Sequence, residues 1–164
     1  MGYFSIIYGR IQGARDMTGN NNSPHIGKLY AHNRFAVESL PDTDDDYPYL
    51  TRHMFALAHP RLGFSYDRGI IRYQIVHFGA CLKVDSVDTR FADDWLRKFE
   101  ERVLSILVWK TAIVHFEHEV AGERVARYRA KPSSLVAVGR EFAEIGGWYT
   151  EKLEWESALG AFAE

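Results

Sequence analysis

The chain has few of the residues that would place it outside the cell or in a membrane. Its single cysteine, Cys81, allows no intramolecular disulfide. That residue lies in an apolar run over residues 77–84, which predicts a buried, unreactive thiol. The first residues lack the basic leader of a secretion signal, and no apolar run approaches the ~20 residues of a membrane-spanning helix. We therefore expect a cytoplasmic protein in a reducing compartment, with no membrane partner.

An excess of charge of one sign is also lacking. The 164 residues include 20 Lys and Arg against 22 Asp and Glu, so the net charge is -2. Proteins that bind nucleic acid or anionic membranes without sequence preference usually carry a clear positive excess. We therefore expect no general affinity for nucleic acid. The length predicts one domain, residues 1–164, which can bury a sufficient core without a metal or a disulfide.

Sequence motifs of nucleotide-binding and nucleophilic enzymes are missing. Gly27 and Lys28 lie between a predicted strand and a predicted helix, where a phosphate-binding loop is often found. That loop also needs a glycine at position 22 and Ser or Thr at position 29, but the chain has Asn22 and Leu29. No Gly-x-Ser-x-Gly segment occurs either. The sequence therefore predicts no catalytic activity and no cofactor.

The most informative feature present is a change of hydrophobic period between residues 69 and 130. Residues 70–84 predict one long strand, and residues 111–120 and 123–130 predict two more, with a hairpin turn between them. Between these strands, residues 91–109 predict a helix whose apolar face consists of Trp95, Leu96, Phe99, Val103, Ile106 and Leu107. This order predicts a strand-helix-strand crossover followed by a hairpin.

The rest of the chain completes the predicted fold. Residues 3–11 predict a first strand that is apolar on both faces, so we expect it in the centre of the sheet. Residues 12–28 predict a long loop, and residues 49–58 have helical spacing without a firm assignment. Further helices are predicted over residues 29–40, 133–145 and 148–162, the last with a strand as the alternative. The predicted fold class is α+β, with a mainly antiparallel sheet of about four strands and helices packed on it.

Ionisable residues are densest between residues 115 and 119. On a strand, His115, Glu117 and Glu119 point to one side, and His77 joins them if the long strand lies beside theirs. Such a set would suit a metal site or an acid-base pair in a small metal-dependent hydrolase. The simpler interpretation is structural, with both glutamates paired to arginines across the hairpin. The same reasoning pairs Asp94 with Lys98 on the solvent side of the helix.

Basic residues are concentrated in the last predicted strand and just after it. Arg127, Arg129 and Lys131 lie beside Tyr128, which is the composition of a surface that binds RNA. An RNA-associated protein is therefore another alternative. The competing interpretation is the ladder of ion pairs described above, in which Arg127 and Arg129 are the partners of the two glutamates.

Carboxylates and aromatic residues occur together in a short segment before residue 50. The residues are Asp42, Asp44, Asp45, Asp46, Tyr47 and Tyr49. A solvated turn would explain them, and a calcium loop of the EF-hand type would need a glycine and a distal glutamate that are missing. They would also suit a basic protein partner, because carboxylates steer the encounter and tyrosines supply buried contacts.

The size, the predicted cytoplasmic location, the missing catalytic motifs and this acidic, aromatic segment form a recognisable combination. In these respects the chain resembles the immunity proteins of bacterial polymorphic and contact-dependent toxin systems. The resemblance lies in overall organisation and implies no role for any single residue. It implies a protein-binding module whose partner is a toxin domain, for example a basic nuclease, neutralised in a tight complex. If the acidic segment is only a turn, residues 13–28 are the alternative contact surface.

Overall fold

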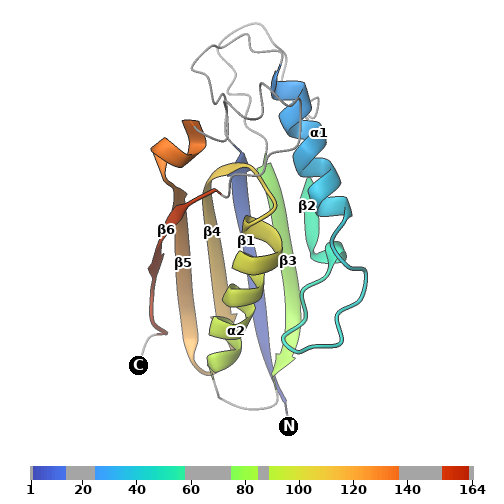
Figure 1. The fold of residues 1–164 in the computed structure, drawn as a ribbon. Helices are drawn as coiled ribbons and strands as arrows, with labels where there is room; N and C mark the ends of the chain where they lie inside the picture. Colours follow the sequence, from blue (N-terminus) through green and yellow to red (C-terminus); the bar gives the residue numbers. More distant parts are fainter. Residues whose placement is uncertain (1, 14–24, 58–74, 85–88, 137–152, 163–164) are drawn as a thin grey trace, which may run out of the picture.

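The described part of the chain forms one antiparallel sheet with helices on one side. The computed structural model describes residues 2–13, 25–57, 75–84, 89–136 and 153–162. Within these residues the elements are β1 (Tyr3–Gly13), α1 (His25–Glu38), the 3-10 turn η1 (Arg52–Met54), β2 (Phe55–Leu57), β3 (Ile75–Val84), α2 (Arg90–Phe99), the π-helical turn η2 (Glu100–Leu104), β4 (Trp109–His118), β5 (Gly122–Ala130) and β6 (Trp155–Leu159). Residues 132–136 are also helical. The strand order is β2-β3-β1-β4-β5-β6 (Figure 1).

The predicted fold class is confirmed, while the sheet is larger than predicted. Six strands are described rather than about four, and every neighbouring pair is antiparallel. β3 and β4 both pair with β1, which is central as its two apolar faces predicted. Because both run antiparallel to β1, they are parallel to each other, and α2 connects them across β1. This is the predicted strand-helix-strand crossover.

The two strands that were not predicted, or predicted only as an alternative to a helix, lie at the edges of the sheet. β2 has only 3 residues and directly follows η1, so its segment shows helical spacing. The predicted helix over residues 148–162 is wrong at Trp155–Leu159, which pair with β5 as β6. The strand alternative is correct there, and residues 148–152 lie outside the description. α1 begins at His25 rather than residue 29, so the predicted loop ends earlier.

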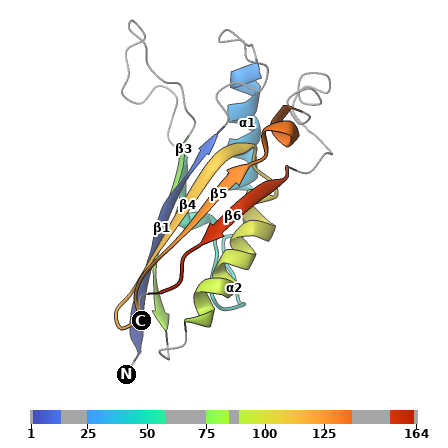
Figure 2. The same cartoon turned by 90° about the vertical axis from the view of Figure 1, so that its left-hand side faces the viewer.

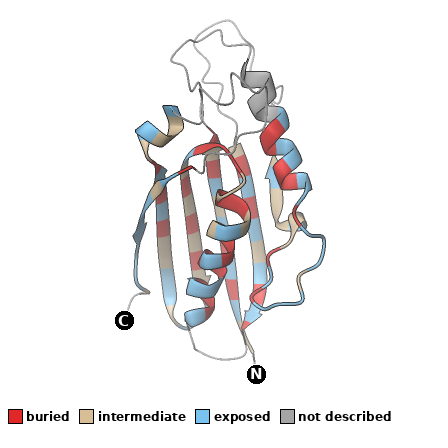
Figure 3. Ribbon diagram, in the orientation of Figure 1, coloured by how far each residue is buried: buried red, intermediate tan, exposed pale blue. Residues whose placement is uncertain are grey.

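The hydrophobic core lies between α2 and the sheet. Trp95 and Phe99 are fully buried, and the Phe99 ring centroid lies 5.2 Å from that of Phe78 on β3. The Trp95 ring contacts that of Phe116 on β4 edge to face, with centroids 5.9 Å apart. Burial alternates along the strands, with the buried positions facing α2 (Figure 3). The predicted core face of the helix is confirmed at Trp95, Leu96, Phe99 and Val103, whereas Ile106 is only partly buried. The predicted helix end is wrong, because the helical residues end at Leu104 and Trp109 already belongs to β4, so the buried Leu107 lies between the two elements.

The opposite side of the sheet is called the open face here. It consists of the side chains of β1, β3, β4 and β5 that point away from α2. Figure 2 shows α2 on one side of these strands. The described helices α1 and α2 both lie on the other side. Cys81 points to the open face and is exposed, so the predicted buried thiol is wrong. On β3 the residues that face α2 are the even-numbered ones, such as Val76 and Leu82, and Cys81 falls between them.

Candidate functional site

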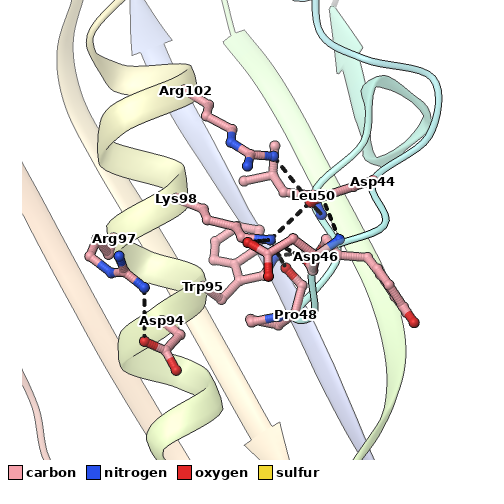
Figure 4. A network of polar contacts seen from close by, with 10 residues as sticks. Asp44, Asp46, Pro48, Leu50, Asp94, Trp95, Arg97, Lys98 and Arg102 are labelled. Carbon is pink, nitrogen blue, oxygen red and sulfur yellow. Dashed lines mark hydrogen bonds and ion pairs between the residues drawn. The ribbon is translucent and has the colours of Figure 1, made fainter.

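The acidic segment forms an ordered loop that is fixed to α2 through Asp44. We call residues 42–50 the acidic loop. One carboxylate oxygen of Asp44, Oδ2, accepts hydrogen bonds from the backbone N–H of Leu50 at 2.9 Å, from Lys98 Nζ at 3.1 Å and from Arg102 Nη1 at 3.1 Å (Figure 4). The other oxygen accepts the backbone N–H of Asp46 at 3.2 Å. The side chain of Asp44 is only 5% exposed.

Lys98 supplies the matching charge from α2. Its side chain is 6% exposed, and its ammonium group donates to the backbone oxygens of Asp46 and Pro48 as well as to Asp44. Asp46 Oδ2 lies 3.1 Å from the same nitrogen. A buried ammonium is stable only when it is paired and its protons are bonded, and the loop provides both. The predicted pair between Asp94 and Lys98 is therefore wrong, and Asp94 pairs with Arg97 instead.

Hydrogen bonding decides the charge state of Asp44. Burial by itself raises the pKa of this carboxyl group, but the hydrogen bonds from the Leu50 amide, Lys98 and the Asp46 amide outweigh it and lower the pKa to about 2. Asp44 is therefore ionised at neutral pH. Its negative charge therefore pairs with Lys98 and Arg102 inside the protein and is not exposed to solvent.

The acidic loop alternates between residues that face the protein and residues that face solvent. Pro48 and Leu50 are buried, and the backbone oxygen of Tyr49 accepts a hydrogen bond from Trp95 Nε1 at 3.2 Å. The Tyr47 and Tyr49 rings point outward and are 41% and 45% exposed as residues. They contact each other edge to face, with centroids 5.5 Å apart. The loop therefore presents two aromatic rings as one patch.

Most of the predicted contact residues lie on this one surface. Asp42, Asp45, Asp46, Tyr47 and Tyr49 are exposed, whereas the Asp44 side chain is buried. Asp42 is partly neutralised by Arg52, whose Nε lies 2.8 Å from its carboxylate. Sequence patterns missed Lys98, Arg102 and Trp95 as the residues that hold the loop. The sequence feature that could have identified Lys98 is its position among the apolar residues of α2.

The residues proposed for a metal-dependent hydrolase lie on or beside the open face but do not converge. Tyr8 contacts two of them. Its ring stacks on that of His115, with the ring centroids 4.9 Å apart, and its hydroxyl donates a hydrogen bond to Glu117 Oε1 at 2.7 Å. This bond to Glu117 raises the pKa of Tyr8. Glu119 accepts the backbone N–H of Phe4 at 3.3 Å, and His77 lies opposite Arg10 on β1. Within the described residues, no three His, Cys, Asp or Glu side chains are placed to hold one metal ion.

The predicted ion pairs across the hairpin are wrong. In the observed register Glu117 lies opposite Glu123, while Arg127 and Arg129 lie opposite Ile113 and Thr111. The turn uses three residues, 119–121, and Gly122 follows at a φ of 80°, a conformation that glycine adopts without strain. This longer turn moves the arginines out of reach of the glutamates.

The arginines instead line a shallow pocket on the sheet. Arg127, Arg129 and Arg10 surround a volume of about 420 Å³, with Glu156 as the carboxylate in its lining. Lys131, the third basic residue of the proposed RNA surface, directly follows β5, is not among the residues that line this pocket, and pairs with Glu154 at 3.0 Å. The structure thus places two of the three predicted RNA-binding residues together.

Comparisons with known proteins give no relative for this chain. No family model matches the sequence, and neither a curated protein nor a solved structure matches it significantly. Among the described helices, none is long and apolar enough to cross a membrane.

Proposed function

We propose that the protein is a protein-binding module and that its acidic loop is the contact surface. The observation that carries this proposal is the paired exposure of Tyr47 and Tyr49 on a loop that Asp44 and Lys98 hold in place. Tyrosine is enriched among the residues that contribute most to binding energy at protein interfaces, so two exposed tyrosine rings in contact suit the centre of one.

The order of the loop supports binding because it lowers the cost of association. Immobilising a flexible side chain at an interface costs about 0.5–1.5 kcal/mol, and a loop that is already fixed avoids part of that cost. Asp44 contributes here by binding the amides of Asp46 and Leu50, on either side of the tyrosines. Exposed carboxylates such as Asp45 would then increase the rate of encounter with a basic partner.

We further propose that the protein acts in the cytoplasm as an immunity protein, neutralising a bacterial toxin domain by forming a tight complex. The basis is the resemblance in size and organisation together with the acidic, aromatic surface. A basic nuclease domain is the class of toxin that fits best, because its charge complements the loop.

The two alternatives have less support. A metal-dependent hydrolase would need His77, His115, Glu117 and Glu119 to converge. Instead Tyr8 contacts His115 and Glu117, and the Phe4 amide binds Glu119. An RNA-associated protein would use Arg127 and Arg129, but the net charge of -2 disfavours a polyanionic ligand.

The proposal is tested with the product of a neighbouring gene in the source genome. We expect that product to inhibit growth when it is produced alone and to be neutralised when this protein is co-expressed. The double variant Tyr47→Ala/Tyr49→Ala should bind it at least about 30-fold more weakly, since a buried aromatic contact contributes ~2 kcal/mol or more.

A matched control keeps this test specific. Val120, in the turn between β4 and β5, is 54% exposed and lies outside the acidic loop. Val120→Ala should bind and protect like the wild type. If the double tyrosine variant also binds like the wild type, the acidic loop is not the contact surface.

A further inference from the structure

A pocket on the open face gathers arginine side chains from two strands. Its volume of about 420 Å³ falls within the ~300–1,000 Å³ that is typical of sites for small molecules. Ile113 on β4 lies between Arg10 on β1 and Arg127 on β5. Arg129 lies two residues beyond Arg127 on the same side of β5. The pocket therefore has cationic side chains on both sides of the apolar Ile113.

The described residues do not compensate the charges of the three arginines. Glu156 on β6 is the only carboxylate among the described residues that line the pocket, so three positive charges face one negative charge. Glu156 lies opposite Arg129 in the sheet. Even so, none of the ion pairs in the described part of the chain involves Arg10, Arg127 or Arg129. Like charges around one pocket repel each other, and a bound anion would remove that repulsion.

The spacing of the arginines suits an anion with more than one charged group. β1 and β5 are separated by two strand spacings of ~4.8 Å, so the backbones of Arg10 and Arg127 lie about 10 Å apart. Arg129 is displaced by a further ~7 Å along the strand. A guanidinium group donates paired N–H groups whose geometry matches phosphate oxygens. Cations in two rows therefore match two linked phosphoryl groups better than a single carboxylate.

The charges on the rest of the open face favour a small ligand over a long polyanion. Glu117 and Glu123 lie opposite each other, four residues along β4 and β5 from Ile113 and Arg127. A nucleic-acid chain that followed the strands of the sheet would meet these carboxylates, whereas a small anion stays among the arginines. The net charge of -2 disfavours a long polyanion, but the local positive excess decides the affinity for a ligand that fits inside the pocket.

We propose that this pocket is a binding site for the diphosphate group of a small ligand. Arg10 binds it from β1, and Arg127 and Arg129 bind it from β5, each donating N–H groups to phosphoryl oxygens. In the neighbouring row the rings of Tyr8 and His115 stack on each other, and Tyr8 is 39% exposed. A nucleoside diphosphate would also place its base against these rings, whereas inorganic diphosphate would use the arginines alone.

The test is isothermal titration calorimetry of the full chain with inorganic diphosphate and with ADP. We expect one site per chain and a dissociation constant below about 1 mM for both ligands at low salt. Arg10→Ala and Arg127→Ala should each weaken binding by about tenfold or more, because each removes charge-assisted hydrogen bonds to phosphoryl oxygens. Glu156→Gln should instead strengthen binding by about threefold, because it removes a carboxylate from the lining of the pocket.

A matched control separates the pocket from the general charge of the protein. Arg97→Ala removes the same charge from α2, on the other side of the sheet, where the Arg97 side chain is 65% exposed. It should bind both ligands like the wild type. The acidic loop also packs against α2, so the binding of a protein partner there is measured independently of this pocket.

The two ligands distinguish the sources of the diphosphate group. ADP that binds at least about fivefold more tightly than inorganic diphosphate would assign a nucleotide to the pocket, and equal affinities would assign the diphosphate group alone. The proposal is overturned if neither ligand binds at about 1 mM, even where a single-stranded oligonucleotide does. It is also overturned if Arg127→Ala binds both ligands as tightly as Arg97→Ala.

Discussion

Among single residues, Asp44 determines most of the structure around the proposed contact surface. Its carboxylate bonds two loop amides and two cationic side chains, so it connects the acidic loop to both α2 and η2. The neighbouring Asp45 is exposed and has no comparable role. These two adjacent aspartates therefore differ in role: the charge of Asp44 is structural, whereas the charge of Asp45 lies on the surface. The composition of the segment does not distinguish the two roles.

Replacing Asp44 should destabilise the fold. Asp44→Asn removes the charge that compensates the buried Lys98, and breaking a buried pair from one side costs about 3–5 kcal/mol. We expect a loss near the lower value, because the Asp46 and Pro48 oxygens remain bonded to the lysine. Urea unfolding of Asp44→Asn and of the control Asp45→Asn measures the difference. Equal midpoints for the two variants would show that the bonds of Asp44 contribute nothing to stability.

The stability that Asp44 provides should depend on pH in a defined direction. Its pKa is about 2 in the folded protein against an ordinary value of 3.8, so the folded state favours the ionised form. A lowered pKa stabilises the fold above the unfolded value, and the contribution disappears as pH falls through the folded value. The difference in unfolding free energy between wild type and Asp44→Asn should be constant from about pH 5 to 7 and shrink between about pH 4 and 2. A difference that grows on acidification would contradict this assignment.

Among the elements, α2 joins the core to the acidic loop. Its apolar face packs on β3, β4 and β5 through Trp95 and Phe99, while Lys98 between them holds the loop. The Trp95 indole also binds the backbone of Tyr49. One helix thus fixes both the sheet packing and the position of the tyrosines.

Truncating the centre of this helix face should cost much of the stability. Phe99→Ala should lower the free energy of unfolding by about 3–5 kcal/mol, since the ring is fully buried among Phe78, Trp95 and Tyr128. Arg97→Ala is the matched control, because Arg97 is exposed on the same helix. Chemical denaturation of both variants provides the measurement. A midpoint for Phe99→Ala equal to that of the control would mean that the packing of α2 is assigned wrongly.

Some elements of the fold could be predicted from the sequence and others could not, for physical reasons. The faces of α2 and β1 were predictable because burial repeats with the period of the backbone over ten or more residues. β2 was not predicted and β6 was predicted only as the alternative to a helix. Three and five residues at a sheet edge show no clear period, and these strands are defined by their pairing with β3 and β5. The contact between Lys98 and Asp44 was missed because it joins residues 54 positions apart. Local spacing favoured Asp94 as the partner instead.

In the whole molecule, the acidic loop and the open face lie on opposite sides of the sheet. The acidic loop and α2 are on one side (Figures 1 and 2), and the outward-pointing side chains of β1, β3, β4 and β5 are on the other. The sequence predicted that β1 is apolar on both sides and that carboxylates gather near Tyr47 and Tyr49. It did not predict the order of charges on the open face, because that order depends on the register of β1, β4 and β5.

The most direct test of the proposed function is the kinetics of binding to the recovered protein partner. Association and dissociation rates are compared for wild type, Asp45→Lys and Tyr49→Ala. We expect Asp45→Lys to slow association, with an effect that shrinks as salt is added, because it changes an exposed charge that acts by steering. Tyr49→Ala should instead raise the dissociation rate by about 30-fold, as the loss of a buried aromatic contact predicts. Wild-type rates for both variants would contradict the assignment of the acidic loop as the contact surface.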